Sequence, residues 1–599
     1  MSDEKRQEQR GEGFRGDHGT NSGERKPYRG NRDGKKPYGK PSGGDKVGFR
    51  GGKPGFRSAK PGEGGDRPAR REGQGYQRGE GSHQPEGKPA FGGDKREFNG
   101  EKKPFRGDNA HRSGSRPGFG GEKRPYRGDH GPRDGHNPPF RGDHRAAPKD
   151  KPEQMEGLAS RRMALAVLRD VTENGAYASL SLDEKLRNCG LSVTDRRLVA
   201  RLVYDTLDNL IYLDHALDQI MARPDTDIRL RNILRLGACQ IMLEDRIPES
   251  AATNTAVVLC KELGMEGLAG VCNGILRNLI RRKDELSWPD PAVEPVKALS
   301  VRHSVPEWLT ERILRDWGEE AEGILSHRVQ DTYVTVRPNM TLMDDAAFET
   351  LLEKKVWEKE PGAVAHSWRI RGMADVARDA DFAGGNFSIQ SESSMMAAMA
   401  VNPQPGMQVL EACAAPGGKA CLMAEMMNGS GRVQAWDVHP HRTELIAAQA
   451  RRLKLENIRP MTRDAAKPRE ELIETMDAVL LDAPCSGLGV MAEKPDVKYR
   501  VKPESVAELV KTQAALLDAV APYVKKGGTL VYSTCSVLKD ENERQIAAFL
   551  AHHPEFEAEA LPESIPEAFR QHAGQGLQLL PHRDHVGGFY ICRMRRKKA

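Results

Sequence analysis

The sequence predicts a multidomain protein: a disordered N-terminal tail, an all-α bundle, a small α+β linker subdomain and an α/β Rossmann-like domain. Leu, Ile and Val are almost absent from residues 1 to about 150. Apolar residues then recur at three- and four-residue spacing to about residue 282, and beyond residue 400 short apolar runs end in glycines or acids. A chain of 599 residues is also too long for one core. The predicted boundaries are 1–152 for the tail, 153–288 for the bundle, 289–385 for the linker and subdomain, and 386–599 for the α/β domain.

The composition indicates a reducing compartment and no membrane partner. All nine cysteines lie at or beyond Cys189 without a paired framework, which fits the cytoplasm. No Cys-x-x-Cys pair occurs, so the sequence predicts no metal site. The N-terminus is charged from Asp3 onward and no apolar stretch is long enough to span a bilayer. We therefore expect neither a signal peptide nor a membrane segment.

The tail carries the basic character of the chain. Residues 1–150 hold 35 Lys and Arg against 22 Asp and Glu, a net charge of +13, so the remaining residues carry −7. Arginine alternates with aromatic residues in six loose repeats: Phe14-Arg15-Gly16, Tyr28-Arg29-Gly30, Phe49-Arg50-Gly51, Phe105-Arg106-Gly107, Tyr126-Arg127-Gly128 and Phe140-Arg141-Gly142. Gly, Pro and charge dominate, so we expect disorder. We expect the tail to add nonspecific RNA contacts; the alternative is a solubilising tail without a dedicated partner.

The segment from about residue 155 to 282 has the pattern of a helical bundle. The expected helices begin near Ser160, Asp195 and Ile228, and two more cover residues 251–263 and 267–280. Apolar residues occupy one face of each helix and Arg residues the opposite face. Periodicity alone also fits a generic bundle whose arginines are merely solvated.

A mixed segment follows the bundle. His303–Leu309 leads into a helix that continues to about Leu325, and Thr332–Arg337 has the composition of a strand. We expect a small α+β subdomain that joins the bundle to the C-terminal domain.

A glycine loop indicates a ligand site in the α/β domain. Residues 407–410 are predicted to form a strand, Glu411 to Lys419 a tight loop, and Ala420 to Met427 a helix. Small residues in such a loop let a ligand approach the backbone closely. The Gly-Lys-Ser/Thr order of a phosphate-binding loop is absent, which argues against ATP hydrolysis.

Acids close the next three predicted strands, at Asp437, Asp464 and Asp482. Asp437 lies about 20 residues past the glycines, where an acid can accept hydrogen bonds from ribose hydroxyls. The alternative is that all three are ordinary turn acids, but the repetition favours binding. A final strand pair, around residues 577–580 and 588–592, completes a mostly parallel sheet with a terminal hairpin.

Two cysteines follow apolar runs that are predicted to be buried strands. Cys485 lies in Asp-Ala-Pro-Cys-Ser-Gly after residues 476–481, and Cys535 lies in Ser-Thr-Cys-Ser after residues 529–532. Thiols at the ends of two strands of one sheet can lie side by side over the crevice where such sheets bind ligands. Each is either a small buried hydrophobe or a nucleophile.

Four motifs occur in the order seen in one enzyme family. They are Glu-Ala-Cys-Ala-Ala-Pro-Gly-Gly-Lys (411–419), Asp-Ala-Pro-Cys-Ser-Gly (482–487), Lys-Pro-Asp-Val-Lys-Tyr (494–499) and Tyr-Ser-Thr-Cys-Ser (532–536). In this order they resemble the Sun/NOL1/NOP2 family of RNA cytosine-C5 methyltransferases. The helices ahead of them, with Asn-Gly-Ile-Leu-Arg-Asn at 273–278, resemble a NusB-like RNA-binding domain. The chain is thus similar to the bacterial 16S rRNA members of that family.

The resemblance implies a class I methyltransferase domain that uses S-adenosyl-L-methionine to methylate 16S rRNA, in a protein that is a monomer. The cofactor-binding residues it implies are Cys413, Ala414, Ala415, Pro416, Gly417, Gly418, Lys419, Asp437, Asp464 and Asp482. The thiols of Cys413 and Cys421 are expected to be packing groups rather than reactive ones. Lys419 has two open interpretations: it faces the reaction centre, or it caps the following helix.

Methylation of cytosine C5 explains why such a site needs a thiolate. C5 is a poor nucleophile, and addition of a thiolate to C6 converts the ring to an enamine that can attack a methyl sulfonium. Chemistry alone does not choose between the two cysteines, because DNA cytosine methyltransferases use the cysteine of a Pro-Cys motif. The family resemblance assigns the attack to Cys535, product release to Cys485, and a hydrogen bond to the base to Asp482. Two alternatives stay open at this point: a tRNA cytosine-C5 methyltransferase, and a non-catalytic RNA-binding factor.

Overall fold

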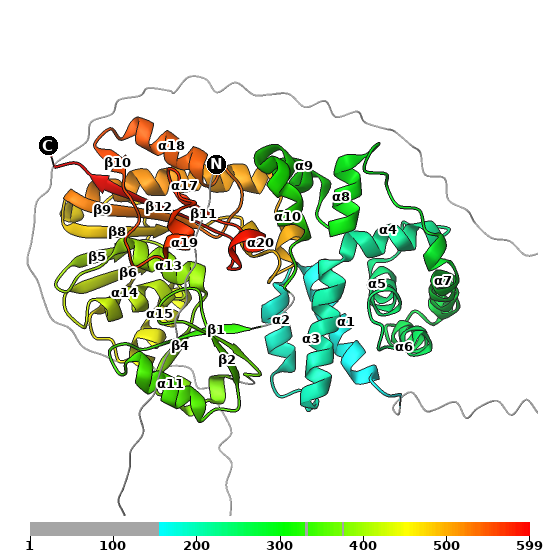
Figure 1. Cartoon of the computed structure of the whole chain (residues 1–599). Coiled ribbons are helices and arrows are strands. Elements are labelled where there is room, and N and C mark those ends of the chain that lie inside the picture. The colour runs from blue at the N-terminus through cyan, green and yellow to red at the C-terminus, as the bar shows by residue number, and fades with distance from the viewer. Residues whose placement is uncertain (1–154, 330–332, 374–375, 599) are drawn as a thin grey trace, which may run out of the picture. The chain divides into compact units, whose positions relative to one another are not determined.

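The computed structural model describes residues 155–329, 333–373 and 376–598. The predicted tail lies outside these residues. The described chain runs from a set of helices, through a small antiparallel sheet, into a larger mixed sheet (Figure 1).

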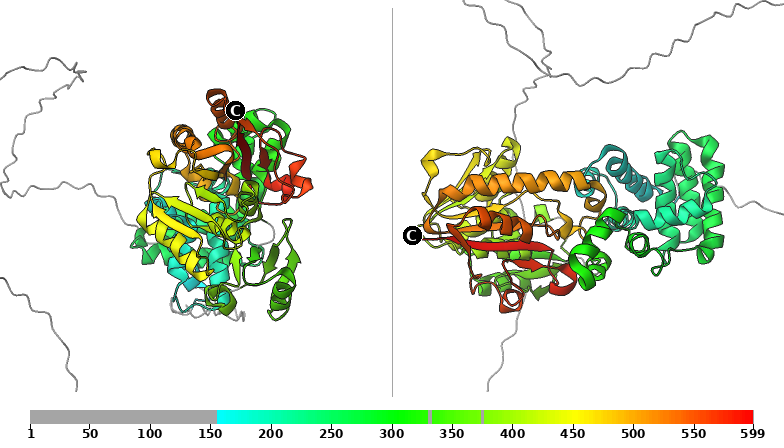
Figure 2. Two further views of the ribbon diagram at one scale, coloured as in Figure 1. Left: turned by 90° about the vertical axis from the view of Figure 1, so that its left-hand side faces the viewer. Right: turned by 90° about the horizontal axis from the view of Figure 1, so that it is seen from above.

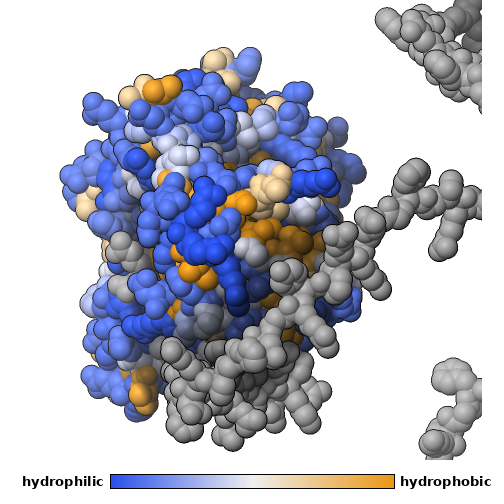
Figure 3. Space-filling view, turned by 90° about the vertical axis from the view of Figure 1, so that its right-hand side faces the viewer, coloured by the Kyte–Doolittle hydropathy of each residue, from blue (hydrophilic) through white to orange (hydrophobic). Residues whose placement is uncertain are grey.

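Seven helices form the predicted bundle and share one hydrophobic core. They are α1 (Leu158–Asn174), α2 (Ala178–Leu186), α3 (Val193–Asp208), α4 (Leu210–Ile220), α5 (Ile228–Met242), α6 (Glu249–Glu262) and α7 (Ala269–Arg282). Their apolar faces turn inward, and the face of the molecule drawn in Figure 3 is mostly hydrophilic.

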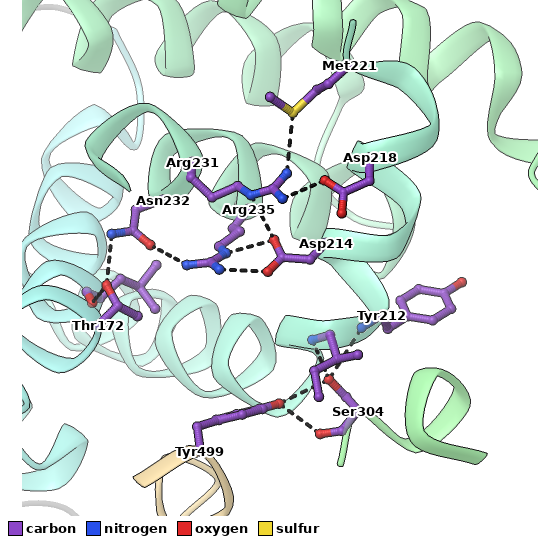
Figure 4. A network of polar contacts seen from close by, with 12 residues as sticks. Thr172, Tyr212, Asp214, Asp218, Met221, Arg231, Asn232, Arg235, Ser304 and Tyr499 are labelled. Carbon is purple, nitrogen blue, oxygen red and sulfur yellow. Dashed lines mark hydrogen bonds and ion pairs between the residues drawn. The ribbon is translucent and has the colours of Figure 1, made fainter. Parts of the chain in front are cut away.

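Several arginines of these helices make specific contacts within the bundle, which disagrees with the alternative of a generic bundle whose arginines are merely solvated. Arg161 is only 5% exposed and donates to Gln240 over 2.7 Å. Arg231 and Arg235 of α5 converge on Asp214 of α4, at 3.4 and 2.6 Å (Figure 4). The bundle therefore contains specific, partly desolvated ion pairs between helices in addition to apolar packing.

The described part of the next segment contains five α-helices and a four-stranded antiparallel sheet of order β2-β3-β1-β4. The elements are α8 (Pro295–His303), α9 (Glu307–Trp317), α10 (Ala321–Ser326), β1 (Val334–Pro338), α11 (Asp345–Glu353), β2 (Glu358–Pro361), β3 (Trp368–Arg371), α12 (Ala380–Ala383) and β4 (Phe387–Ile389). This is the predicted α+β subdomain, and it has a small aromatic core of its own around Phe348, Trp368 and Phe387.

The larger sheet has the strand order β10-β12-β9-β8-β5-β6-β7, with β11 paired to β12. Its strands are β5 (Gln408–Glu411), β6 (Arg432–Asp437), β7 (Ile458–Thr462), β8 (Met476–Asp482), β9 (Val524–Thr534), β10 (Phe556–Ala558), β11 (Leu577–Leu579) and β12 (Phe589–Arg596). Strands β5 to β9 pair in parallel and β10 to β12 pair antiparallel, as predicted. The chain adds β6 and β7 on one side of β5 and then β8 and β9 on the other, so the strand order reverses beside β5. Open α/β sheets bind ligands at such switch points.

Helices cover both faces of this sheet (Figures 1 and 2). One face packs against α13 (Glu392–Val401), α14 (Gly418–Met426) and α15 (Pro440–Arg452), and the other against α17 (Pro503–Val520) and α18 (Glu543–His552). Neighbouring strand residues alternate between the two cores, as Leu480 and Leu481 do. Burial on both faces explains why the strands read as continuous apolar runs.

The loop that follows Cys485 joins the sheet to the helical bundle. Lys498 is 1% exposed and donates to the backbone oxygen and Oδ1 of Asp208, at 2.9 and 2.7 Å. The hydroxyl of Tyr499 donates to the Ser304 carbonyl over 2.9 Å, and Ser304 in turn accepts from the N-terminal amide of α4 at Ile211 (Figure 4). Buried polar contacts of this kind hold only when every partner is in place.

The buried amine of Lys498 makes stability depend on pH. Burial lowers the pKa of Lys498 to about 8 from 10.5, although Asp208 opposes the shift. Between these values the unfolded chain binds more protons than the folded one, so the free energy of unfolding rises with pH across this window. We expect this gain, at most about 3 kcal/mol, to be missing from Lys498→Met.

Urea unfolding of the two proteins at about pH 7 and about pH 10 measures the difference. Lys511→Met, which changes an exposed lysine of α17, should keep the wild-type pH dependence. Parallel profiles for wild type and Lys498→Met would contradict the assignment.

Candidate functional site

The two predicted cysteines lie together at the carboxyl ends of β8 and β9. These strands pair in parallel with Asp482 opposite Ser533, so the loop after each strand leaves the sheet at the same edge. The Sγ atoms of Cys485 and Cys535 are 3.2 Å apart, and both residues are half-buried. The two thiols therefore lie side by side at the carboxyl edge of the sheet.

The hydrogen bond between the two thiols shifts their pKa values in opposite directions. The hydrogen bond from Cys485 lowers the pKa of Cys535, against burial and Asp482, with help from the charges of Lys419 and Lys494. The same hydrogen bond, together with burial, raises the pKa of Cys485 well above its usual range. The hydrogen bond therefore favours ionisation of Cys535 over that of Cys485, which is the electrostatic pattern of a nucleophile and its neighbour.

Asp482 and Lys419 form an ion pair beside the thiols. Lys419 Nζ lies 2.7 Å from Asp482 Oδ2, and the Ser533 hydroxyl donates to Asp482 Oδ1 over 2.8 Å. Although burial opposes the change, the carboxylates of Asp482 and Glu411 raise the pKa of Lys419, so its amine stays charged. Of the two interpretations of Lys419, the ion pair with Asp482 supports the one in which it faces the reaction centre.

The glycine loop turns sharply from β5 into α14. Gly417 has a φ of 106°, and a Cβ there would lie 3.2 Å from the Ile446 backbone, so only glycine fits without a shift. The amide of Ala414 donates to the Trp436 carbonyl over 2.7 Å, which ties the loop to β6. The loop therefore leaves the first amides of α14 at the switch point of the sheet.

The predicted acids also gather at this edge. Asp437 ends β6, is 3% exposed, and accepts from the His439 amide over 3.0 Å; Asp464 lies two residues beyond β7. Glu411, which ends β5, is 1% exposed and its Oε2 atom has no hydrogen-bond partner. Burial raises the pKa of Glu411 to about 8. A buried acid with one unpartnered oxygen, the carboxylates at the end of β6 and just beyond β7, and an open glycine turn suit a ligand with hydroxyl and amino groups, as S-adenosylmethionine has.

The other loop cysteines are inert. Burial raises the pKa of Cys413 and of Cys421 to about 12, so their thiols stay protonated, as expected for packing groups. Cys413 is half-buried within the glycine loop.

Sequence reasoning missed Glu541, which is completely buried next to both cysteine loops. It stands between Asp540 and Asn542 in a polar run that has no apolar periodicity. Nothing in that local pattern distinguishes Glu541 from its acidic neighbours, because its burial depends on contacts with residues far away in the sequence.

Within the described ranges there is no group of three or more His, Cys, Asp or Glu arranged to hold a metal ion. Among the same residues, no helix is long and apolar enough to cross a membrane. Two cavities of about 400 and 500 Å³ lie around Gly574–Gly576, and none of the predicted site residues lines either of them.

The fold and the site together define a Rossmann-like methyltransferase domain with a cysteine pair, preceded by a helical domain. The model of the 16S rRNA methyltransferase RsmB/F family matches residues 398–595, and that of the NusB family matches residues 158–281. The chain belongs to the RsmB/F family of 16S rRNA methyltransferases, and S-adenosylmethionine is its methyl donor.

Full-length relatives agree with this family. A probable ribosomal RNA small subunit methyltransferase B of Bacillus subtilis (strain 168) is 39% identical over 448 residues, which are 74% of this chain and 100% of the relative. A protein of the same description from Synechocystis sp. is 34% identical over 450 residues, or 73% of this chain and 100% of the relative. The crystal structure of PH0851 superposes with a TM-score of 0.64 at 25% identity, covering 73% of this chain and 99% of that one. The predicted family, fold class and NusB-like domain are confirmed.

The shared proton of the cysteine pair leads to a prediction about thiol reactivity. Cys535 should be alkylated faster than Cys485 by iodoacetamide, because only the thiolate reacts. In Cys485→Ala the donor that lowers the pKa of Cys535 is gone, while burial and Asp482 remain, so the apparent pKa of Cys535 should rise.

Alkylation rates across about pH 6 to 10, measured by peptide mass spectrometry, give the relative reactivity of the two thiols and the apparent pKa of Cys535. Cys189→Ser, which changes a half-buried cysteine between α2 and α3, should leave the Cys535 profile unchanged. Faster alkylation of Cys485, or an unchanged Cys535 profile in Cys485→Ala, would show that the thiolate is assigned to the wrong residue.

Proposed function

We propose that the protein transfers a methyl group from S-adenosylmethionine to C5 of a specific cytosine in 16S rRNA, through a covalent bond between Cys535 and cytosine C6. The observation that carries this proposal is the thiol pair, whose Sγ atoms are 3.2 Å apart and in which the pKa of Cys535 is the lowered one. Activity on rRNA does not by itself specify which atom is methylated. A pair of cysteines beside the cofactor site suits covalent addition to C6 of a pyrimidine.

The first step uses Cys535 and Asp482. The Cys535 thiolate forms a bond to C6. The C5–C6 double bond becomes a C4–C5 double bond, and the electron pair of the C4–N3 double bond moves to N3, which takes a proton from water. Asp482, which is paired with Lys419 at 2.7 Å, can accept a hydrogen bond from the protonated N3 and so stabilise the adduct. C5 then has the electron density of an enamine carbon.

The glycine loop, Asp437 and Asp464 would hold the methyl donor beside this carbon. When bound, S-adenosylmethionine supplies an electrophilic methyl group on a sulfonium. The carboxylates at the ends of β6 and beyond β7 suit its hydroxyl groups, and the open turn at Gly417 and Gly418 suits close approach to the backbone.

Product release regenerates the aromatic ring. Water takes the C5 proton, the electrons of the C5–H bond form the C5–C6 double bond, and the bond between C6 and Cys535 Sγ breaks with its electron pair returning to sulfur. N3 gives back the proton that it took in the first step. Cys485 assists because its thiol donates to the leaving thiolate over 3.2 Å, and a stabilised thiolate is a better leaving group. The same contact explains why one cysteine attacks and the other releases.

The proposed RNA substrate rests on the descriptions of the relatives. Those with the greatest coverage are described as acting on small-subunit ribosomal RNA, which favours rRNA over tRNA. The NusB-like helices are the part of the described chain that supports RNA binding. We also propose that the enzyme acts as a monomer in the cytoplasm, where its nine free cysteines would stay reduced.

Separate substitutions of the two cysteines test the mechanism. Cys535→Ala should lower methyl transfer by at least about 10³-fold and form no adduct, because the nucleophile is lost. Cys485→Ala should accumulate a protein–RNA complex that survives denaturation, because addition proceeds and release does not. Cys189→Ser should behave as wild type.

The assay measures labelled methyl groups from S-adenosylmethionine in unmethylated 16S rRNA and in tRNA, together with the denaturation-resistant complex. An exchange of the two phenotypes would overturn the assignment of roles. Methylation of tRNA alone, or of an atom other than C5, would overturn the proposed substrate or product.

A further inference from the structure

Glu541 is a fully buried carboxylate that contacts both cysteine loops. It has no exposed surface and lies just before α18. One oxygen accepts from the Ser486 amide over 2.8 Å and from the Gln513 side chain over 3.0 Å. The other accepts from the hydroxyls of Ser486 and Ser536, each at 2.5 Å.

The two serines connect this carboxylate to the chemistry. Ser486 follows Cys485 and Ser536 follows Cys535, so each thiol lies one residue from a group bonded to Glu541. The two serine hydroxyls are themselves 3.0 Å apart. A single side chain therefore connects the end of β8 to the end of β9 immediately beyond the paired strands.

Neighbouring groups reinforce the same connection. The Tyr532 hydroxyl donates to the Glu541 carbonyl over 2.7 Å, and Asn542 donates to the Ser536 carbonyl over 2.9 Å. The segment 541–542 is thus bonded to β9 and to both loops, and a displacement of Glu541 would move each loop relative to the other.

Burial of this carboxylate is costly, and its contacts include no cation. An ionised carboxyl removed from water loses several kcal/mol or more of hydration, which hydrogen-bond donors must replace. Four donors do so here. An apolar side chain of similar size would fill the space at lower cost, so packing alone does not account for a glutamate. Short hydrogen bonds to a charged acceptor instead give a strong and directional connection.

We propose that Glu541 is a positioning residue that sets the distance between Cys485 and Cys535 by holding Ser486 and Ser536. This inference rests on the proposed division of roles between the two cysteines. Attack uses the Cys535 thiol, and Cys485 affects this step only through the pKa of Cys535, whereas release requires the Cys485 thiol itself at hydrogen-bond distance. Loss of Glu541 should therefore slow release more than attack.

Two substitutions with different remaining contacts test this role. Glu541→Ala removes all four hydrogen bonds. Glu541→Gln keeps one acceptor oxygen for Ser486 N and Gln513, and the serine hydroxyls can rotate to accept from its amide, so it should partly rescue function. Glu543→Gln, which changes a nearby partly exposed glutamate of α18, is the matched control.

Single-turnover assays with 16S rRNA and S-adenosylmethionine should follow adduct formation and its decay separately. In Glu541→Ala we expect decay to slow at least about tenfold while formation slows less than about threefold, with an unchanged KM for RNA. Glu541→Gln should fall between this variant and wild type, and Glu543→Gln should match wild type. Equal slowing of both steps, or no lasting adduct, would overturn the positioning role.

Alkylation of Cys535 provides a second readout that does not depend on methylation. The pH profile of Cys535 in Glu541→Ala should shift in the same direction as in Cys485→Ala, because both lose the aligned thiol donor. If Glu541→Ala does not fold, the smaller shift expected in Glu541→Gln decides the matter. If Cys485→Ala accumulates no covalent adduct, the proposed roles of the two cysteines are wrong. If Cys485→Ala shifts the pH profile of Cys535 alkylation and neither Glu541 variant does, the inference about Glu541 is wrong.

Discussion

Parallel pairing of β8 with β9 is the constraint on which the site depends. The register places Asp482 opposite Ser533 and brings the next loops to one edge, where the two thiols lie 3.2 Å apart. A slip of one residue would turn every side chain of a strand to the other face. Because both faces of these strands are buried, such a slip would move residues from each core into the other and disrupt the packing of both. The packing of the whole sheet therefore brings the two cysteine loops to the same edge.

Buried charge supports that arrangement on both sides. Lys419 and Asp482 neutralise each other next to the thiols, while Glu541 binds the serines behind them. Each charged group is desolvated, and each has partners that replace water. The loop beyond Cys485 then continues to Lys498, whose contact with Asp208 connects it to the helical bundle. The cysteine loop is thus held by the sheet, by Glu541 and by the bundle.

The sequence was informative where a local pattern carries the information. Short apolar runs that end in Asp482-Ala-Pro-Cys485 and Thr534-Cys535 predicted two neighbouring strands, and the structure has them. The glycine loop and Asp437 were found for the same reason. The assignment of attack to Cys535, however, came from a family resemblance, and the hydrogen bond from Cys485 now gives it an independent physical basis. Glu541, the partners of Lys498 and the burial of Arg161 were missed, because each depends on residues that are distant in sequence.

The central claim is that Cys535, and not its neighbour, bonds to cytosine. RNA carrying 5-fluorocytosine at the target position tests it directly, because fluorine replaces the C5 proton whose loss precedes release. Wild-type protein incubated with this RNA and S-adenosylmethionine should form a lasting complex. Digestion and mass spectrometry should place the methylated nucleotide on the peptide that contains Cys535. A nucleotide on the Cys485 peptide, or no complex with RNA that is otherwise a substrate, would contradict the account.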